Sequence, residues 1–263
     1  MATILTEIKP NNLTEYKDWI YEKFRWDENA KNYYSSVTNT MKDSFEKSDF
    51  WLAFIESLDY TAEDYYIVTK YELLQANFKP KIYIKPYDSF LDKSFRKNVL
   101  LNAEWPNEPS NGWITFENAY GKIGDILRTS VIVRYLDGID FVIKSLQRNC
   151  TENNQKCSID YQAKTEGYYA VHIDVTHEFE IPSLTWESKK ISASVEIQVT
   201  TQIKDVIKSL THQLYEKDRL EACSEKLDWQ WDYKSDRFVI NYLGHIMHYL
   251  EGSIMEIRDK GEK

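Results

Sequence analysis

Two segments in the second half of the chain alternate between apolar and polar residues, the pattern of a β-strand with one buried face. Residues 167–175 read GYYAVHIDV and residues 194–200 read SVEIQVT. In a strand, successive side chains point to opposite faces of the sheet. The valines and isoleucines therefore share the core face, whereas the opposite face carries Glu196, Gln198 and, in the first segment, His172. Because two strands both place polar residues on that second face, we expect a functional site there rather than a plain solvated surface.

Length and composition indicate an ordinary globular protein. The 263 residues suffice for a sizeable core, and 42% of them are hydrophobic and 29% charged. The net charge of −9 argues against a general nucleic-acid coat, whose binding depends on Lys and Arg, although a local basic patch stays compatible with it. The three cysteines are too few and too scattered for a disulfide framework or a zinc site. Neither a membrane span nor a signal peptide is recognisable, so we expect a cytoplasmic protein with no membrane partner.

Helical and strand-like patterns divide the chain into three regions. Apolar residues recur at three- and four-residue spacing from Asn12 to about Leu74, with Asn12 and Thr14 as candidate helix caps. Further along we expect strands at 81–85, 130–136 and the two opening segments, helices at 88–99, 139–148, 201–215 and from 220 onward, and polar loops at 102–121 and 151–164. Helices flanking a mixed sheet of about five strands predict an α+β fold. We expect a helical N-terminal region over 1–75, a core over 76–219 and a C-terminal helical extension over 220–263.

Lysines, isolated carboxylates and an aromatic residue next to a glycine follow one another along the core. Lysines hold phosphate charge, and carboxylates bind the Mg²⁺ that bridges phosphate oxygens. A tyrosine offers a flat face on which a base can stack. In chain order the residues are Lys85, Ser89, Lys93, Asp125, Lys164, Tyr168, His172, Glu196, Asp205 and His212. This set predicts chemistry on nucleotide phosphates.

These residues resemble the RelA/SpoT synthetase domain, whose members transfer pyrophosphate from ATP to the 3′-hydroxyl of a guanine nucleotide. The resemblance runs from about Lys81 to Lys217, about half of the chain. Five segments carry it, in the order of the family: KPYDSFLDK at 85–93, Asp125-Ile126 before a β-branched strand, KTEGY at 164–168 followed by His172, VEIQVTT at 195–201 and SLTH at 209–212. The resemblance implies a nucleotidyltransferase-like core.

The resemblance also implies a role for each matching residue. The ATP side comprises Tyr83, Lys85, Ser89, Lys93, Arg96 and Arg128. The acceptor side comprises Lys164, Tyr168, His172, Gln198 and His212. Asp125 and Glu196 are the implied Mg²⁺ ligands and, together with Lys93, the implied catalytic residues. Mg²⁺ is therefore the expected cofactor.

Three positions depart from the pattern of the family. Tyr83 stands where the family has an Arg against the adenine, and a tyrosine can stack there instead. After Asp125 the family has Gly, an apolar residue and Arg, whereas this chain has Arg128, Thr129 and Ser130. The resemblance implies that Arg128 replaces the missing guanidinium from a shifted position. Thr200 replaces another Arg in the strand that carries Glu196. Because these departures fall partly on the acceptor side, the acceptor is open between a purine nucleotide, guanine first, and the 3′ end of tRNA.

Three classes of function fit these patterns. The first is a pyrophosphokinase that makes an alarmone from ATP and a free purine nucleotide. The second is a toxin of the same family that pyrophosphorylates tRNA and is neutralised by an antitoxin protein. The third is an inactive descendant that binds a nucleotide or a partner. A homo-oligomer is compatible with each. For the lysines the structural alternative is a solvated helix face, and for His172 and His212 a hydrogen-bonded structural role.

Overall fold

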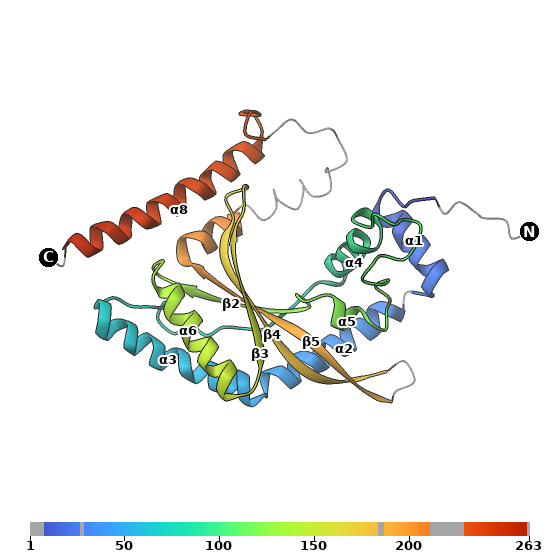
Figure 1. The fold of residues 1–263 in the computed structure, drawn as a ribbon, viewed down its shortest axis with the longest axis horizontal. Coiled ribbons are helices and arrows are strands. Elements are labelled where there is room, and N and C mark those ends of the chain that lie inside the picture. The colour runs from blue at the N-terminus through green and yellow to red at the C-terminus, as the bar shows by residue number, and fades with distance from the viewer. Residues whose placement is uncertain (1–7, 27–28, 184–186, 211–228, 262–263) are drawn as a thin grey trace, which may run out of the picture. The chain divides into compact units, whose positions relative to one another are not determined.

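The computed structural model describes residues 8–26, 29–183, 187–210 and 229–261 (Figure 1). The chain begins with three helices, α1 (Leu13–Phe24), α2 (Asn29–Glu46) and α3 (Asp49–Thr69). Asn12 caps α1 by accepting a hydrogen bond from the Glu15 N–H at 2.9 Å, as predicted, whereas Thr14 lies inside that helix. The predicted helical start of the chain is therefore confirmed as far as Thr69.

Five strands form one sheet in the order β1-β2-β5-β4-β3. Their bounds are Tyr83–Ile84 (β1), Leu127–Val133 (β2), Lys156–Ala163 (β3), Tyr169–Pro182 (β4) and Ser188–Thr201 (β5). β1 runs antiparallel to β2, with Tyr83 opposite Arg128 and Ile84 opposite Leu127. The α+β class and the mixed five-stranded sheet match the prediction.

The remaining helices follow the strands. They are α4 (Tyr87–Phe95), which continues into the π-helix η1 (Arg96–Leu100), α5 (Ala119–Lys122), α6 (Gly138–Glu152), a helical segment at 202–210 and α8 (Asp236–Gly261). The helix expected at 88–99 is thus confirmed as α4 and η1. Among the described residues, no helix combines the length and the apolar character that crossing a membrane requires.

Parts of the predicted sheet need correction. The polar loop expected at 151–164 is wrong, because residues 156–163 form β3. β3 lies at the edge of the sheet, where a strand has a neighbour on one side only and can be largely polar. Only Cys157 and Ile159 are apolar residues on its less exposed face, so the alternation is too weak to predict a strand. The strand expected at 130–136 is Leu127–Val133: its first residues pair with β1, and residues 134–136 belong to the turn before α6. β4 and β5 also extend well beyond the two opening segments.

The contacts divide the chain into two compact units. Unit 1 comprises 1–48, 82–128 and 175–196, and unit 2 comprises 49–81, 129–174 and 197–263. β2, β4 and β5 contribute residues to both units. The sequence-based division at residues 75 and 219 stays a prediction.

Unit 1 packs around aromatic side chains. Tyr16, Tyr34, Phe90 and Tyr120 are almost fully buried, and the ring centroids of Tyr34 and Phe90 lie 4.6 Å apart. The Tyr16 hydroxyl donates to Ser94 Oγ at 3.0 Å, which ties α1 to α4. This buried polar group is thus hydrogen-bonded, as a close-packed interior requires.

In unit 2, α3 packs against α6. The Asn149 side chain of α6 donates to the carbonyl oxygen of Phe50 at 2.9 Å, and Ser145 donates to Ser57 at 3.2 Å. Tyr65 and Phe54 of α3 are completely buried. The large apolar face of α3 is therefore core, as its three- and four-residue spacing predicts.

Candidate functional site

In unit 1, two lysines hold one carboxylate. Lys85 Nζ donates to Asp125 Oδ2 at 2.9 Å, and Lys93 Nζ donates to Asp125 Oδ1 at 2.8 Å. The exposed fraction is 10% for the Lys85 side chain, 26% for Lys93 and 17% for Asp125. The structure thus brings together three residues predicted from separate segments. We name Lys85, Lys93 and Asp125 the Asp125 cluster.

The backbone around Lys85 is fixed from two directions. Its N–H donates to the carbonyl oxygen of Ile126 at 2.8 Å, which continues the β1–β2 pairing and brings Lys85 beside Asp125. The buried hydroxyl of Tyr34, on α2, donates to the carbonyl oxygen of Lys85 at 2.6 Å. Lys93 follows on α4, which begins directly after Pro86. Lys93 therefore stands on a helix, whereas Lys85 directly follows β1 and Asp125 lies in the turn before β2, where the hydrogen bond between Lys85 and Ile126 holds the two segments together.

Burial and charge act in opposite directions on the cluster. Burial raises the pKa of Asp125, but the hydrogen bonds from Lys93 and Lys85 outweigh it and lower that pKa to about 2. Burial lowers the pKa of Lys85, and Asp125 offsets only part of this effect, while Lys93 and Arg128 lower it further. Asp125 is therefore ionised, and the two ammonium groups face a single negative charge. The surplus positive charge favours an anionic ligand.

The other residues of the predicted ATP side lie on the same unit. Tyr83, 58% exposed, and Arg128 are opposite each other on β1 and β2, so their side chains share a face of the sheet. Ser89 lies on α4 one helical turn before Lys93 and therefore on the same helix face. Arg96, at the start of η1, donates to Asp92 Oδ2 at 3.0 Å rather than to a member of the Asp125 cluster.

The donor set fits a magnesium ion held together with phosphate oxygens. Asp125 is an ionised oxygen donor, and Glu196 lies half-buried on β5 between the core residues Val195 and Ile197. Mg²⁺ is usually bound by one or two carboxylates plus substrate phosphates rather than by a full protein cage. In the part of the chain that the structure describes, no group of three or more His, Cys, Asp or Glu residues forms such a cage. The roles of Asp125 and Glu196 as metal ligands stay predictions.

The predicted acceptor residues of unit 2 centre on the turn between β3 and β4. The Gly167 N–H donates to the carbonyl oxygen of Lys164 at 2.9 Å, and the Lys164 N–H donates to that of Tyr168 at 3.0 Å. Gly167 has φ +74°, a left-handed conformation that glycine adopts without steric cost and that three-residue hairpin loops require. We name residues 164–168 the acceptor turn. Its sequence, KTEGY, therefore has a local structural reason besides its resemblance.

Tyr168 is held by its neighbours in the acceptor turn and on β4. Its hydroxyl is hydrogen-bonded to His172 Nε2 at 2.8 Å, and Lys164 Nζ lies 5.7 Å from the centre of its ring. The structure thus brings together Lys164, Tyr168 and His172. His172 supports Tyr168, which agrees with the structural alternative considered for it.

Gln198 and the helix after β5 form a second group in unit 2. Gln198 is buried, and its Oε1 accepts a hydrogen bond from Lys208 Nζ at 2.8 Å. Asp205 lies on the same helical segment as Lys208. His212 lies outside the described residues.

Sequence reasoning missed several residues that hold the site. Tyr34 donates to the Lys85 carbonyl oxygen, and Lys208 donates to the Gln198 side chain. The partners in each pair are so far apart along the chain that no local sequence pattern predicts the contact. Tyr169 is another such residue, since its hydroxyl is hydrogen-bonded to His245 of α8. A glycine inside a helix, such as Gly244, is the sequence signal that predicts the close approach of another segment to the backbone of α8.

The fold is that of the small alarmone synthetases, as comparison with solved structures shows. Small alarmone synthetase 1 from Bacillus subtilis, bound to its product pppGpp, superposes with a TM-score of 0.52 at 17% identity, over 84% of this chain and 98% of that chain. A GTP pyrophosphokinase family protein from Streptococcus pneumoniae gives a TM-score of 0.49 at 20% identity, over 83% and 93% of the two chains. The resemblance seen in the sequence is therefore confirmed at the level of the fold.

Sequence comparison gives no match of comparable extent. No protein-family model matches the chain, and no curated protein matches it either. Since identities this low establish the fold alone, the activity has to be argued from the site.

Proposed function

We propose that the chain is a pyrophosphokinase that transfers the β,γ-pyrophosphate of ATP to the 3′-hydroxyl of a purine nucleotide, with a guanine nucleotide as the first candidate. The observation that carries the proposal is the Asp125 cluster, in which one ionised carboxylate meets the buried Lys85 and the partly buried Lys93. The shared fold supports it, because a protein of that fold has been solved with its product pppGpp. The surplus charge of the cluster fits the polyphosphate of ATP.

The lysines and Tyr83 are proposed to bind the donor. Lys85 and Lys93 would contact the β- and γ-phosphates, with Ser89 and Arg96 as further polar contacts. Tyr83 and Arg128, side by side on β1 and β2, would cover the adenine. Since phosphoryl-type transfer needs little covalent participation by the protein, the contribution of these residues is positioning and charge neutralisation.

The acceptor is proposed to stack on Tyr168, with Lys164 close to its phosphates. Its 3′-oxygen attacks the β-phosphorus, so that an O–P bond forms there while the bond between the β-phosphorus and the α,β-bridging oxygen breaks and AMP leaves with that oxygen. The proton of the 3′-hydroxyl passes to a carboxylate, for which Glu196 is the candidate, or to solvent. When bound, Mg²⁺ held by Asp125 and Glu196 supplies charge neutralisation of the phosphate oxygens.

A tRNA acceptor is the second candidate, and one observation favours it. Thr200 stands on β5 where the family has an Arg, so this position offers no guanidinium to the acceptor. Thr200 is also buried. Lys93, Arg96 and Lys97 stand three and four residues apart on α4 and η1, the spacing of one helix face, and would supply the local basic patch for tRNA. A toxin of this kind would be neutralised by an antitoxin protein.

One labelling experiment decides between these functions. The protein is incubated with Mg²⁺ and ATP labelled at the β-phosphate, and GDP, GTP, ADP, ATP and deacylated tRNA are offered separately. Transfer of the label to one acceptor, with release of AMP, supports pyrophosphate transfer and names the acceptor. A folded sample that binds ATP and labels none of them would contradict the proposal and favour an inactive nucleotide-binding protein.

A further inference from the structure

The backbone of α8 lies directly against the acceptor turn. A methyl group added at Gly167 would overlap the carbonyl oxygen of Asn241, and one added at Gly244 would overlap the carbonyl oxygen of Gly167. Two glycines, one in the turn and one inside the helix, thus permit a contact between main chains. Since a glycine in a helix interior costs stability relative to alanine, its place here is explained by this close approach.

His245, the next residue of α8, bridges the helix to both ends of the turn. Its Nε2 lies 2.9 Å from the carbonyl oxygen of Thr165, and its Nδ1 lies 2.8 Å from the hydroxyl of Tyr169. Because a carbonyl oxygen can only accept, Nε2 carries the proton and donates. In the neutral ring Nδ1 then accepts from the Tyr169 hydroxyl. One imidazole therefore fixes the residues on either side of Tyr168 and Gly167.

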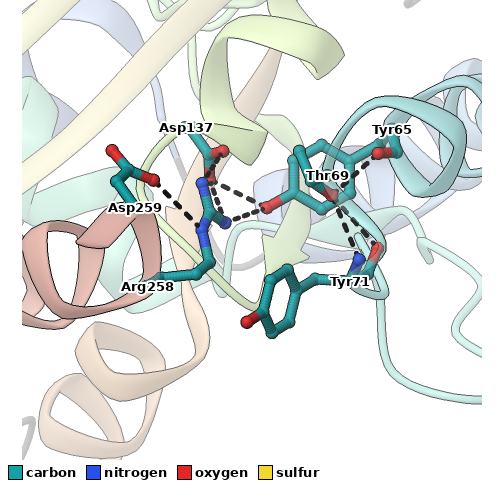
Figure 2. Close-up of polar contacts among 6 residues, drawn as sticks. All are labelled: Tyr65, Thr69, Tyr71, Asp137, Arg258 and Asp259. Atoms are coloured by element: carbon teal, nitrogen blue, oxygen red, sulfur yellow. Dashed lines mark hydrogen bonds and ion pairs between the residues drawn. The ribbon is translucent and has the colours of Figure 1, made fainter. Parts of the chain in front are cut away.

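α8 is itself anchored elsewhere in unit 2. Glu251, 5% exposed, accepts a hydrogen bond from Thr201 and lies 3.2 Å from Lys204 Nζ. Seven residues further along, Arg258 donates to Asp137 Oδ2 at 2.6 Å and to the Tyr65 hydroxyl at 2.9 Å (Figure 2). The helix therefore reaches the acceptor turn as a fixed element.

Tyr169 receives further contacts from the same region. The ring of His248 stacks on it, with centroids 3.8 Å apart, and Lys204 Nζ lies 5.2 Å from its centre. The first residue of β4 is thus held by three side chains. Tyr168, its neighbour, is the predicted base-stacking residue.

We propose that His245 is a positioning residue that holds the acceptor turn in the conformation that binds the acceptor nucleotide. The inference rests on the proposed function, and it assigns to α8, which no part of that function uses, a role in the acceptor site. His245 acts through the backbone of Thr165 and through Tyr169, not on the reacting atoms. Preorganisation of this kind lowers the ordering cost of acceptor binding.

Four variants separate the two arms of His245. His245→Ala removes both hydrogen bonds. His245→Gln keeps a donor at the reach of Nε2, and His245→Asn keeps an acceptor at the position of Nδ1. Tyr169→Phe removes the hydroxyl alone. Tyr249→Ala, an exposed change on α8, is the matched control.

Two readouts are measured on the full chain, namely hydrogen exchange of the amides of 164–168 without ligand and the KM values for acceptor and ATP. We expect His245→Ala to raise amide exchange and acceptor KM by about tenfold, with kcat and ATP KM changed by less than about twofold. His245→Gln should restore most of the wild-type values, because it keeps the bond to Thr165. Should His245→Ala fail to fold, His245→Asn, which lacks the bond to Thr165, is compared with His245→Gln, which keeps it.

The outcomes are distinguishable from failure of the proposed function. Unchanged exchange in the turn overturns the positioning role, whatever the activity. Faster exchange with an unchanged acceptor KM in an active enzyme overturns the link between the turn and the acceptor. Absence of transfer to any acceptor in the wild-type protein overturns the proposed function, and the assignment of the turn to an acceptor falls with it.

Discussion

Two carboxylates near the ends of β2 are both held by cations, but their surroundings differ. Asp125, before β2, faces two lysines, whereas Asp137, after β2, pairs with one arginine. Arg258 is 9% exposed in its side chain and lies 5.2 Å and 5.4 Å from the rings of Tyr71 and Tyr135. Figure 2 shows the arginine beside Asp137, Asp259 and the Tyr65 hydroxyl.

The charges explain the difference between the two groups. At Asp137 a single arginine meets that carboxylate and, at 3.6 Å, the more exposed Asp259, so no positive charge is in excess. Burial lowers the pKa of Arg258, but its hydrogen bonds to Asp137 and Tyr65 outweigh burial and raise it. At Asp125 two ammonium groups share one carboxylate, and the pKa of Lys85 is lowered. A cation matched by carboxylates suits a structural anchor, whereas surplus positive charge suits an anionic substrate. The comparison teaches that the number of cations around a carboxylate, rather than its burial, separates the two roles.

The largest effect is expected from exchanging each aspartate for its amide. Asp125→Asn should lower kcat/KM by about 10³-fold or more, equivalent to about 4 kcal/mol, since it removes the charge that orders both lysines. Asp137→Asn should leave kcat/KM within about twofold and lower stability instead. Steady-state kinetics and urea unfolding of both variants test this. Equal losses of activity in the two variants would remove the functional distinction between the clusters.

Arg258→Met tests the anchor directly. We expect unfolding free energy to fall by about 3 kcal/mol, because Asp137 loses its charge partner in a partly buried place. Lys260→Gln is the control, since its pair with Glu256 is largely exposed and should contribute less than about 0.5 kcal/mol. Urea denaturation gives both numbers. A loss no larger than that of the control would mean that the arginine is not an anchor.

Lys93→Met leaves Asp125 with a single cation, which is the number that Asp137 has. Activity should fall by about 10²-fold, about 2.7 kcal/mol, through loss of a phosphate contact, while unfolding free energy changes by less than about 1 kcal/mol. Kinetics and calorimetry of the same sample measure the two effects. A loss of unfolding free energy as large as about 2.7 kcal/mol would contradict a functional role for Lys93 distinct from the anchoring role of Arg258.

Acid should weaken the Asp125 cluster in a defined range. The pKa of Asp125 is lowered from 3.8 to about 2 in the folded protein, so its stabilising contribution is complete above pH 4 and is lost as the pH falls toward 2. A shift of this size corresponds to about 2 kcal/mol. The difference in unfolding free energy between wild type and Asp125→Asn should therefore narrow by about that amount from pH 5 to pH 2. A constant difference would show that the carboxylate is not held by the lysines.

Local pattern predicted much of the fold. Alternation identified the cores of β4 and β5, and helical spacing identified α1 to α4. It failed at β3, because an edge strand needs few apolar residues. It also missed the start of β2, which depends on pairing with β1.

The sequence by itself determined the kinds of residue available and the periodicity that forms helices and strands. Only the tertiary structure decided that Lys85 and Lys93 meet at Asp125, that Arg258 meets Asp137 and that His245 reaches the acceptor turn. Asp125 and Asp137 look alike in the chain, since each stands near an end of β2. Their partners lie up to 121 residues away, and contacts over such separations leave no local signature. The number of cations around each carboxylate is set only when distant segments pack together, and this number separates the candidate site from the anchor.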